Sequence, residues 1–167
     1  MRNRQSGFTL VELITVMLLI GILSAVAFSR FGDTAVYRQA LFIDQLHSYL
    51  RLTQQLAMTQ KVPLADANHG TTATFSLIKQ PQAQWQVIIA NGTHSQSYQL
   101  NGELDVKIDS QALASNDRLD LSFDANGDIS ARSFPQGADI SFSTALQIGE
   151  NSLCIAPTGF SYEGPCI

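Results

Sequence analysis

Residues 8–28 read FTLVELITVMLLIGILSAVAF, an apolar run interrupted by a single charged residue, Glu12. At 1.5 Å per residue, 21 residues form a helix about 30 Å long, which matches the hydrocarbon core of a bilayer. Glu12 is the sole ionisable residue between Arg4 and Arg30. Two arginines precede the run, and positively charged flanks stay on the cytoplasmic side. We therefore expect a transmembrane helix over residues 8–29, with a cytoplasmic N-terminus and an exported remainder.

Composition narrows the class of protein. The chain has 167 residues, of which 45% are apolar, enough for a packed core and too many for a disordered chain. One run is long enough to span a membrane, which argues against a polytopic protein. The net charge is −4. Removing Arg2 and Arg4 with a leader would leave eight basic and fourteen acidic side chains, a net charge of −6. A nucleic-acid partner is therefore not expected.

Three interpretations of the N-terminus compete. The first is a plain signal anchor. The second is a secretory signal peptide, cleaved after Ala27 in the small-residue sequence Ala25-Val26-Ala27. The third is a segment in which Glu12 has a function. A carboxylate at mid-membrane costs about 2.5–3.5 kcal/mol, and neither a signal anchor nor a signal peptide needs one.

The stretch Gly7-Phe8-Thr9-Leu10-Val11-Glu12-Leu13 resembles the processing site of type IV pilins and type II secretion pseudopilins. The resemblance implies that residues 1–7 are a leader and that prepilin peptidase cuts between Gly7 and Phe8 and N-methylates Phe8. It also implies an assembly role for Glu12. The partners it implies are prepilin peptidase, the inner membrane, other pilin or pseudopilin subunits through the N-terminal helix, and the inner-membrane assembly platform.

Physical chemistry offers Glu12 a partner. Cleavage after Gly7 would free the α-amine of Phe8, which is largely protonated near neutral pH. In a staggered bundle of helices, that amine could meet the Glu12 carboxylate of a neighbouring subunit and set the register, since an unpaired charge there is costly. A contact within one chain, from Phe8 to Glu12, is also compatible with the i,i+4 spacing.

Helical periodicity continues beyond the membrane segment. Apolar residues recur at spacings of three and four, and polar residues, His47 among them, take the other face. Pro63 marks the end. We expect one long helix from Phe8 to Gln60, with residues 30–62 as its amphipathic continuation. The apolar stripe consists of Val36, Phe42, Ile43, Leu46, Tyr49, Leu50, Leu56 and Ala57.

The rest of the chain predicts an antiparallel β domain over residues 63–167, in an α+β fold. Short runs of alternating hydrophobicity are separated by turn signals, and three Asn-Gly pairs, at 91–92, 101–102 and 126–127, each predict a hairpin. No βαβ rhythm is visible. The predicted strands cover residues 71–78, 85–90, 98–100, 104–108, 119–123, 129–134, 140–142, 146–148 and 153–155.

Two cysteines, Cys154 and Cys166, lie near the C-terminus with eleven residues between them. They lack the four closely spaced ligands of a zinc site, and in an exported chain they are expected to form one disulfide. This pair also resembles the disulfide-bounded loop of type IV pilins. The architecture is most similar to the H-type pseudopilins and related minor pilins, which carry two packed sheets. Within the family, the pattern best fits a minor pilin of the mannose-sensitive haemagglutinin pilus system.

Catalytic and metal-binding patterns are missing from the sequence. Asp124, Asn126 and Asp128 have the spacing that opens a calcium loop, but Gly127 and Pro135 stand where such a loop has other residues, so a hairpin turn explains them. We expect no enzyme, no cofactor and no metal. Three functions remain: a structural subunit of a type IV pilus or type II secretion system, an anchored binding module, and a periplasmic protein released after Ala27.

Overall fold

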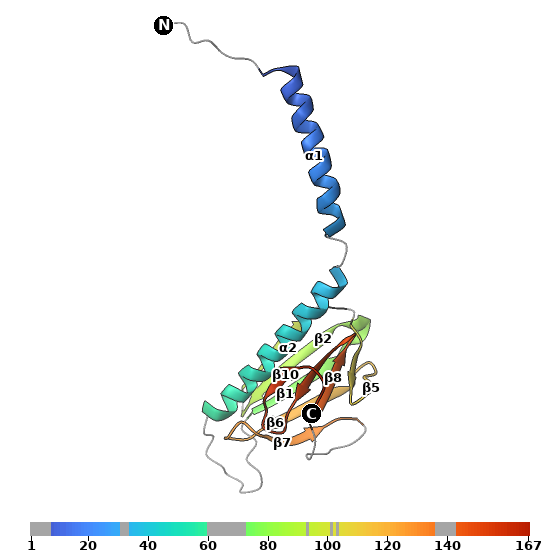
Figure 1. Ribbon diagram of the computed structural model, residues 1–167. Coiled ribbons are helices and arrows are strands. Elements are labelled where there is room, and N and C mark those ends of the chain that lie inside the picture. Colours follow the sequence, from blue (N-terminus) through green and yellow to red (C-terminus); the bar gives the residue numbers. More distant parts are fainter. Residues whose placement is uncertain are drawn as a thin grey trace, which may run out of the picture. The chain divides into compact units, whose positions relative to one another are not determined.

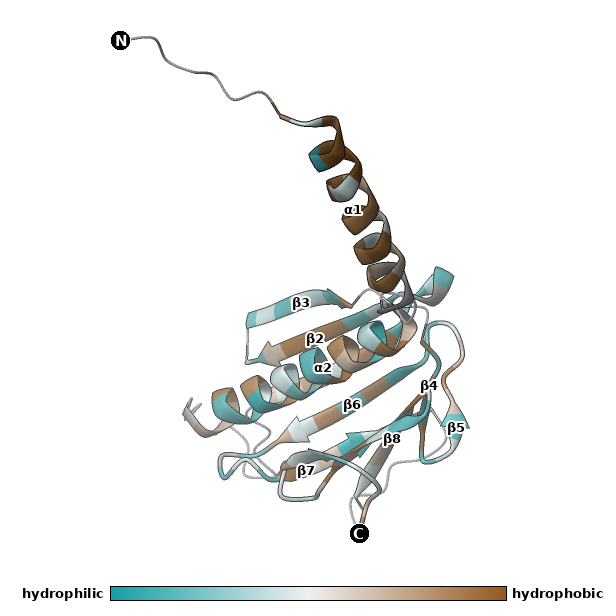
Figure 2. Ribbon diagram, turned by 45° about the horizontal axis from the view of Figure 1, so that its top comes forward, coloured by the Kyte–Doolittle hydropathy of each residue, from teal (hydrophilic) through white to brown (hydrophobic). Residues whose placement is uncertain are grey.

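Helix α1 (Leu10–Arg30) carries apolar side chains on all sides. In the computed structural model, no part of its most hydrophobic window, Leu10–Ala27, is buried, and the mean hydropathy of that window is 2.5. The brown colouring along α1 in Figure 2 shows this composition. A helix that is apolar all round needs lipid or other helices around it. By length and composition α1 can cross a membrane.

The structure describes residues 8–30, 34–59, 73–92, 94–100, 102, 104–135 and 143–167. The chain divides into two compact units, Met1–Tyr37 and Arg38–Ile167. Where the sequence predicts one helix from Phe8 to Gln60, the structure records α1 and α2 (Thr34–Thr59). The residues between them, 31–33, lie outside the described part, so the continuity of the helix stays a prediction.

Helix α2 packs through the predicted stripe. Phe42, Ile43, Leu46 and Leu50 are at most 2% exposed, and Ala57 extends the buried face toward the C-terminal end. Val36 is the exception, at 61% exposed. The amphipathic part of the helix therefore belongs to the same compact unit as the strands, and it provides one wall of the core.

Two antiparallel five-stranded sheets make up the rest (Figure 1). The first has the strand order β3-β2-β1-β6-β7 and the second β10-β9-β8-β4-β5. A 3-10 turn, η1 (Pro81–Ala83), joins β1 to β2. The strands are β1 (Ala73–Lys79), β2 (Trp85–Asn91), β3 (His94–Leu100), β4 (Val106–Ile108), β5 (Gln111–Ala112), β6 (Arg118–Phe123), β7 (Ile129–Ser133), β8 (Thr144–Ile148), β9 (Asn151–Ile155) and β10 (Ser161–Glu163). The predicted α+β fold with two sheets is confirmed.

One hydrophobic core joins α2 to both sheets. Trp85 is fully buried in it, and its indole Nε1 donates a hydrogen bond to the Leu104 carbonyl at 3.0 Å. The Lys79 ammonium lies 5.6 Å from the centre of the Trp85 ring. A buried indole N–H needs such a partner, since leaving it unpaired would cost the energy of its lost hydration.

Two of the three predicted hairpins are present, and the middle one is wrong. β2 pairs with β3 and β6 pairs with β7, but β3 and β4 lie in different sheets. Val106 and Ile108 bury their side chains in the second sheet, where β4 pairs with β5 and β8. β3 and β4 are therefore consecutive along the chain but not partners, because a turn signal in the sequence does not decide which strands pair.

Most of the predicted strands are present in the structure, but two short strands were missed and one prediction cannot be compared. The predicted strand at 140–142 lies outside the described residues. Strands β5 and β10 were not predicted, since each is only two or three residues long. The remaining predicted strands match β1, β2, β3, β4, β6, β7, β8 and β9 to within a few residues.

The predicted disulfide is confirmed between Cys154, fully buried in β9, and Cys166, with the Cα atoms 5.1 Å apart. It ties the C-terminal segment to the second sheet. A crosslink over a loop of this length restricts the unfolded chain by about 3 kcal/mol.

We expect Cys166→Ser to lower the free energy of unfolding by about 2–4 kcal/mol without affecting N-terminal processing. Thermal unfolding of the purified full chain, followed by circular dichroism, measures the loss. Reducing agent should lower the melting temperature of the native chain and leave that of the Cys154→Ser/Cys166→Ser double variant unchanged. Equal melting temperatures for the native chain with and without reductant would contradict a stabilising role.

Candidate functional site

The N-terminus of α1 is closed by a reciprocal cap between Thr9 and Glu12. The Glu12 Oε2 atom accepts hydrogen bonds from the Thr9 backbone N–H and from the Thr9 hydroxyl, both at 3.2 Å. In return, the Glu12 N–H donates to Thr9 Oγ1 at 3.3 Å. The first helical bond, from Leu13 N–H to the Thr9 carbonyl, follows directly. This arrangement is a capping box, in which a Thr and a Glu three residues apart satisfy donors that the first turn leaves open.

The cap gives Glu12 a partner that the sequence analysis missed. The partners expected for Glu12 were a neighbour's amine and Phe8 of the same chain, and Thr9 was not among them. The signal was available, since Thr-x-x-Glu before an apolar run is the sequence pattern of a capping box. A carboxylate is also favoured at a helix N-terminus, where the helix dipole is positive. Helix geometry therefore accounts for part of the role of Glu12.

Of the two residues that flank the predicted cleavage site, the structure describes Phe8 but not Gly7. Phe8 precedes the cap and is 78% exposed. Gly7 and the rest of the predicted leader lie outside the described residues. Cleavage between Gly7 and Phe8 and methylation of Phe8 therefore remain predictions.

A family model for the prokaryotic N-terminal methylation motif matches residues 2–28. The chain carries a type IV pilin-like prepilin signal. The matched segment contains the capped start of α1 and nearly all of its apolar length. No curated protein and no solved structure matches the chain. The signal implies processing by prepilin peptidase and pilin-type interactions, and it fits a membrane-anchored protein.

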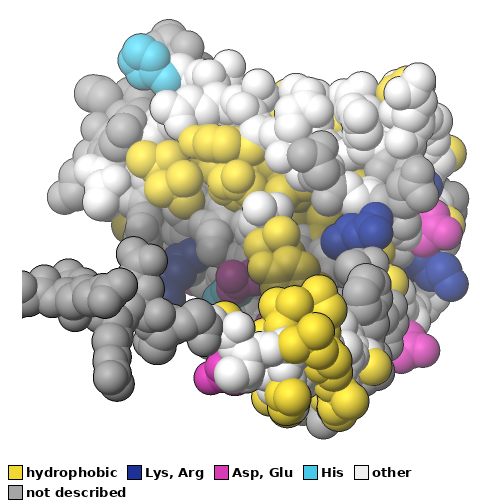
Figure 3. Space-filling model, turned by 90° about the horizontal axis from the view of Figure 1, so that it is seen from above, with side chains coloured by type: hydrophobic (Ala, Val, Ile, Leu, Met, Phe, Trp, Pro, Cys, Tyr) yellow, Lys and Arg dark blue, Asp and Glu magenta, His cyan; other side chains and the backbone are white. Residues whose placement is uncertain are grey.

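Outside the prepilin signal, side chains of both charges are scattered over the face of the molecule that Figure 3 shows. On the face shown in Figure 3, the Lys and Arg side chains stand apart from one another, and Asp or Glu side chains lie among them. Three of the described cations are in ion pairs: Lys79 with Asp105, Arg118 with Asp120, and Arg132 with Asp109. Clustered basic residues are what binding to a phosphate backbone needs. The described side chains on this face form no such cluster.

The acidic turn between β6 and β7 is held by its own backbone. Asp124 Oδ1 accepts hydrogen bonds from the N–H groups of Asn126 and Asp128, at 2.8 and 3.0 Å. Among the described residues, no group of three His, Cys, Asp or Glu side chains is placed to hold a metal ion. Asp124, Asn126 and Asp128 thus lie in the turn of the β6–β7 hairpin, and Asp124 stabilises that turn.

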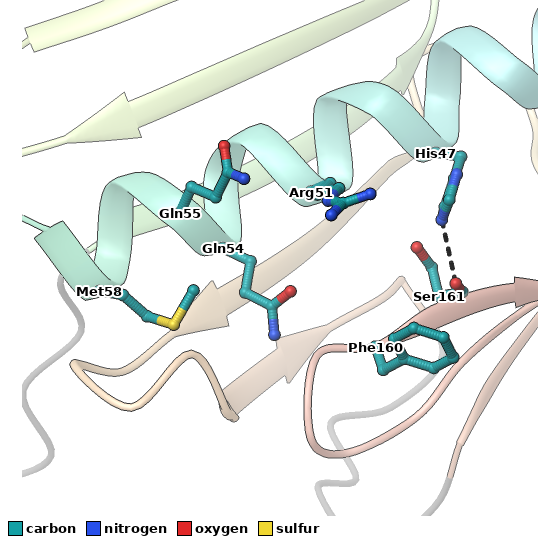
Figure 4. A pocket seen from close by; sticks show the side chains of 7 residues that line it. All are labelled: His47, Arg51, Gln54, Gln55, Met58, Phe160 and Ser161. Carbon is teal, nitrogen blue, oxygen red and sulfur yellow. Dashed lines mark hydrogen bonds between the residues drawn. The ribbon is translucent and has the colours of Figure 1, made fainter.

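A pocket of about 480 Å³ lies between α2 and the turn that precedes β10 (Figure 4). His47 points across it, with Nε2 3.0 Å from the Ser161 carbonyl oxygen, so this half-buried histidine helps to dock the helix. Gln54 donates to the carbonyls of Gly127 and Thr158, both at 3.1 Å. These polar groups are used in packing α2 against the strands, and they form no nucleophile–base pair.

Proposed function

We propose that this protein is a minor pilin-like structural subunit that takes part in the assembly or priming of a type IV pilus. The observation that carries the proposal is the prepilin signal at residues 2–28, which coincides with an exposed apolar helix. In the proposed topology, the helix over residues 8–29 crosses the bacterial inner membrane. The N-terminus is cytoplasmic, and the α+β domain is periplasmic or carried into the filament.

The exposed side chains of α1 support an assembly role. Leu10, Leu13, Met17 and Leu23 are each more than half exposed, although water is a poor solvent for all of them. Before assembly, lipid would cover this surface; in a filament, helices of neighbouring subunits would replace the lipid. A helix with apolar residues on every side is compatible with both lipid and neighbouring helices, because neither environment requires a polar face.

The domain supports a structural role. Its two sheets share one core with α2, and the disulfide fixes its C-terminal segment, as expected of a rigid module outside the cytoplasm. We propose a non-catalytic role. As the specific member, we propose a minor pilin of the mannose-sensitive haemagglutinin pilus system. The same signal also supports a minor pseudopilin of a type II secretion system.

Processing tests the proposal. N-terminal sequencing of the protein from bacterial membranes is expected to begin at N-methylated Phe8, because the peptidase acts at the cytoplasmic face after Gly7. Gly7→Leu should leave essentially all of the protein as the uncut precursor. Gly21→Leu, at a glycine of α1 with open space around it, is the matched control and should be cut normally. A chain that begins at Phe28 would instead establish an ordinary signal peptide and overturn the proposal.

A further inference from the structure

The first two turns of α2 carry apolar side chains that are open to the surroundings. Val36, Tyr37 and Leu41 are 61%, 71% and 44% exposed, and the small Ala40 between them is exposed as well. Residues three and four apart lie next to one another on a helix, so these side chains form one continuous patch. We call these four residues the α2 patch.

The exposed face of α2 changes character beyond the patch. In steps of three and four residues, Tyr37 and Leu41 are followed on the same face by Asp44, Ser48 and Gln55, all of which are exposed. A helix face that meets water over its whole length is usually polar over its whole length. Here the face is apolar only at the end of α2 that follows α1 in the chain. That end therefore has a less polar environment than the rest of the helix.

The chain itself keeps the α2 patch close to a bilayer. This step rests on the proposed function, in which α1 crosses the membrane. The apolar window of α1 ends at Ala27, and Tyr37 follows ten residues later. Ten residues span about 15 Å as a helix and at most about 35 Å when extended. The tether gives the patch a high effective concentration at the lipid surface, which a separate partner protein would lack.

The composition of the patch fits the boundary between headgroups and acyl chains. Tyrosine is enriched at this depth, because its ring is apolar and its hydroxyl reaches water and headgroups. A helix that lies in the interface presents an apolar face to the acyl chains and keeps its polar residues in water. The buried residues Phe42 and Leu46 lie on the opposite side of α2 from Tyr37 and Leu41. Lipid contact and packing on the strands therefore use different faces.

We propose that the α2 patch binds the periplasmic surface of the same bilayer that α1 crosses. Val36, Tyr37 and Leu41 enter the boundary between headgroups and acyl chains, while Asp44 and Ser48 stay in water. The contact holds the exported domain against the membrane in the unassembled subunit.

Spin labelling of the full chain tests this contact. The native cysteines are joined in the disulfide, so a single introduced cysteine can carry a nitroxide. The chain is reconstituted at low density in vesicles of phosphatidylethanolamine and phosphatidylglycerol. Oxygen concentrates in lipid, and a polar nickel chelate on both sides of the bilayer reports contact with water. Ala40→Cys labels the patch without removing a large side chain. Ser48→Cys, on the exposed face beyond the patch, is the matched control.

The label at Ala40 should be at least about fivefold less accessible to the chelate than the label at Ser48, because it lies among the headgroups and acyl chains. Replacing Tyr37 and Leu41 together by serine should return the Ala40 label to water. Met58→Ser is the control for this change, since Met58 is as exposed as Leu41 and lies on the same helix, and it should leave the label where it is.

A third label, at Leu18→Cys in α1, separates this inference from the proposed function. A Leu18 label deep in the bilayer with an Ala40 label as open to the chelate as Ser48 would overturn the lipid contact and leave the anchor standing. A Leu18 label in water would overturn the anchor and the inference with it. An Ala40 label shielded from both reagents would assign the patch to contacts between copies of the chain, and would also overturn the lipid contact.

Discussion

Glu12→Leu is expected to leave the protein in the membrane in normal amounts, cleaved after Gly7, and to reduce its incorporation into filaments at least tenfold. Leucine removes a residue that is costly in the bilayer, so insertion should not suffer. In an assembled bundle, however, the protonated α-amine of a neighbouring Phe8 would lose its counter-charge. An uncompensated buried charge costs about 3–5 kcal/mol, which accounts for a loss of this size.

The capping box at Thr9 supplies controls that separate two roles of Glu12. Glu12→Gln keeps a side chain that can accept from the Thr9 N–H but removes the negative charge. Thr9→Val keeps the charge but removes the hydroxyl to which the Glu12 N–H donates. If the charge directs assembly, Gln should fail like Leu, and Val should assemble. If the carboxylate serves only as a helix cap, Gln should assemble normally.

Cell fractionation distinguishes these outcomes. The native chain and the Leu, Gln and Val variants are followed by immunoblot in inner membranes and in sheared surface filaments, and the ratio of the two fractions is compared. Normal filament content of Glu12→Gln and Glu12→Leu would show that the charge of Glu12 does not direct assembly. Loss of all variants from the membrane fraction would assign Glu12 and Thr9 to insertion instead.

Local pattern in the sequence was sufficient to locate the helical segments and most of the strands. The stripe that contains Phe42, Leu46 and Leu50 predicts the buried face of α2, because helical periodicity is a property of neighbouring residues. The turn at Asn126-Gly127 predicts the β6–β7 hairpin for the same reason. The contact between Glu12 and Thr9 could also have been predicted from the sequence, since both residues lie within one helical turn.

The pairing of strands that lie far apart in the sequence could not be predicted from local pattern. The Asn101-Gly102 signal was wrong about the partner of β4, which pairs with β5 and β8, because several strands of similar pattern compete for each edge. Asn91 was interpreted as a turn residue, but it ends β2 and its side chain is buried. Burial of one amide depends on the packing of α2 over the hairpin, which the sequence of the hairpin does not contain.

Gly159 occupies the most crowded glycine position in the described domain, where two turns meet α2. The turn before β10 packs on the β6–β7 turn, and the Ile129 N–H donates to the Pro157 carbonyl at 2.7 Å. A Cβ at Gly159 would lie 2.2 Å from the Gly127 carbonyl oxygen and 2.8 Å from Gln54 Nε2. Gly159 also has a φ of +73°, which side chains rarely adopt. The two turns can therefore approach this closely only because residue 159 has no side chain.

We expect Gly159→Ala to lower the free energy of unfolding by at least about 3 kcal/mol, since the clash is with backbone and adds to the conformational strain. Gly92→Ala is the matched control: φ is +55° there, but no atom lies within 4 Å of the added Cβ. It should cost only the strain, about 1–2 kcal/mol. Denaturant unfolding of both variants, followed by circular dichroism, measures the difference.

Gln54→Ala tests the same junction from the helix side. It removes both hydrogen bonds from Gln54 Nε2 to the two turns and should cost about 1–3 kcal/mol. Because Gly159 and Gln54 share this contact, the double variant should lose less than the sum of the two single losses. Additive losses, or equal losses for Gly159→Ala and Gly92→Ala, would show that the two turns can move apart without cost and that the junction does not hold α2 on the sheets.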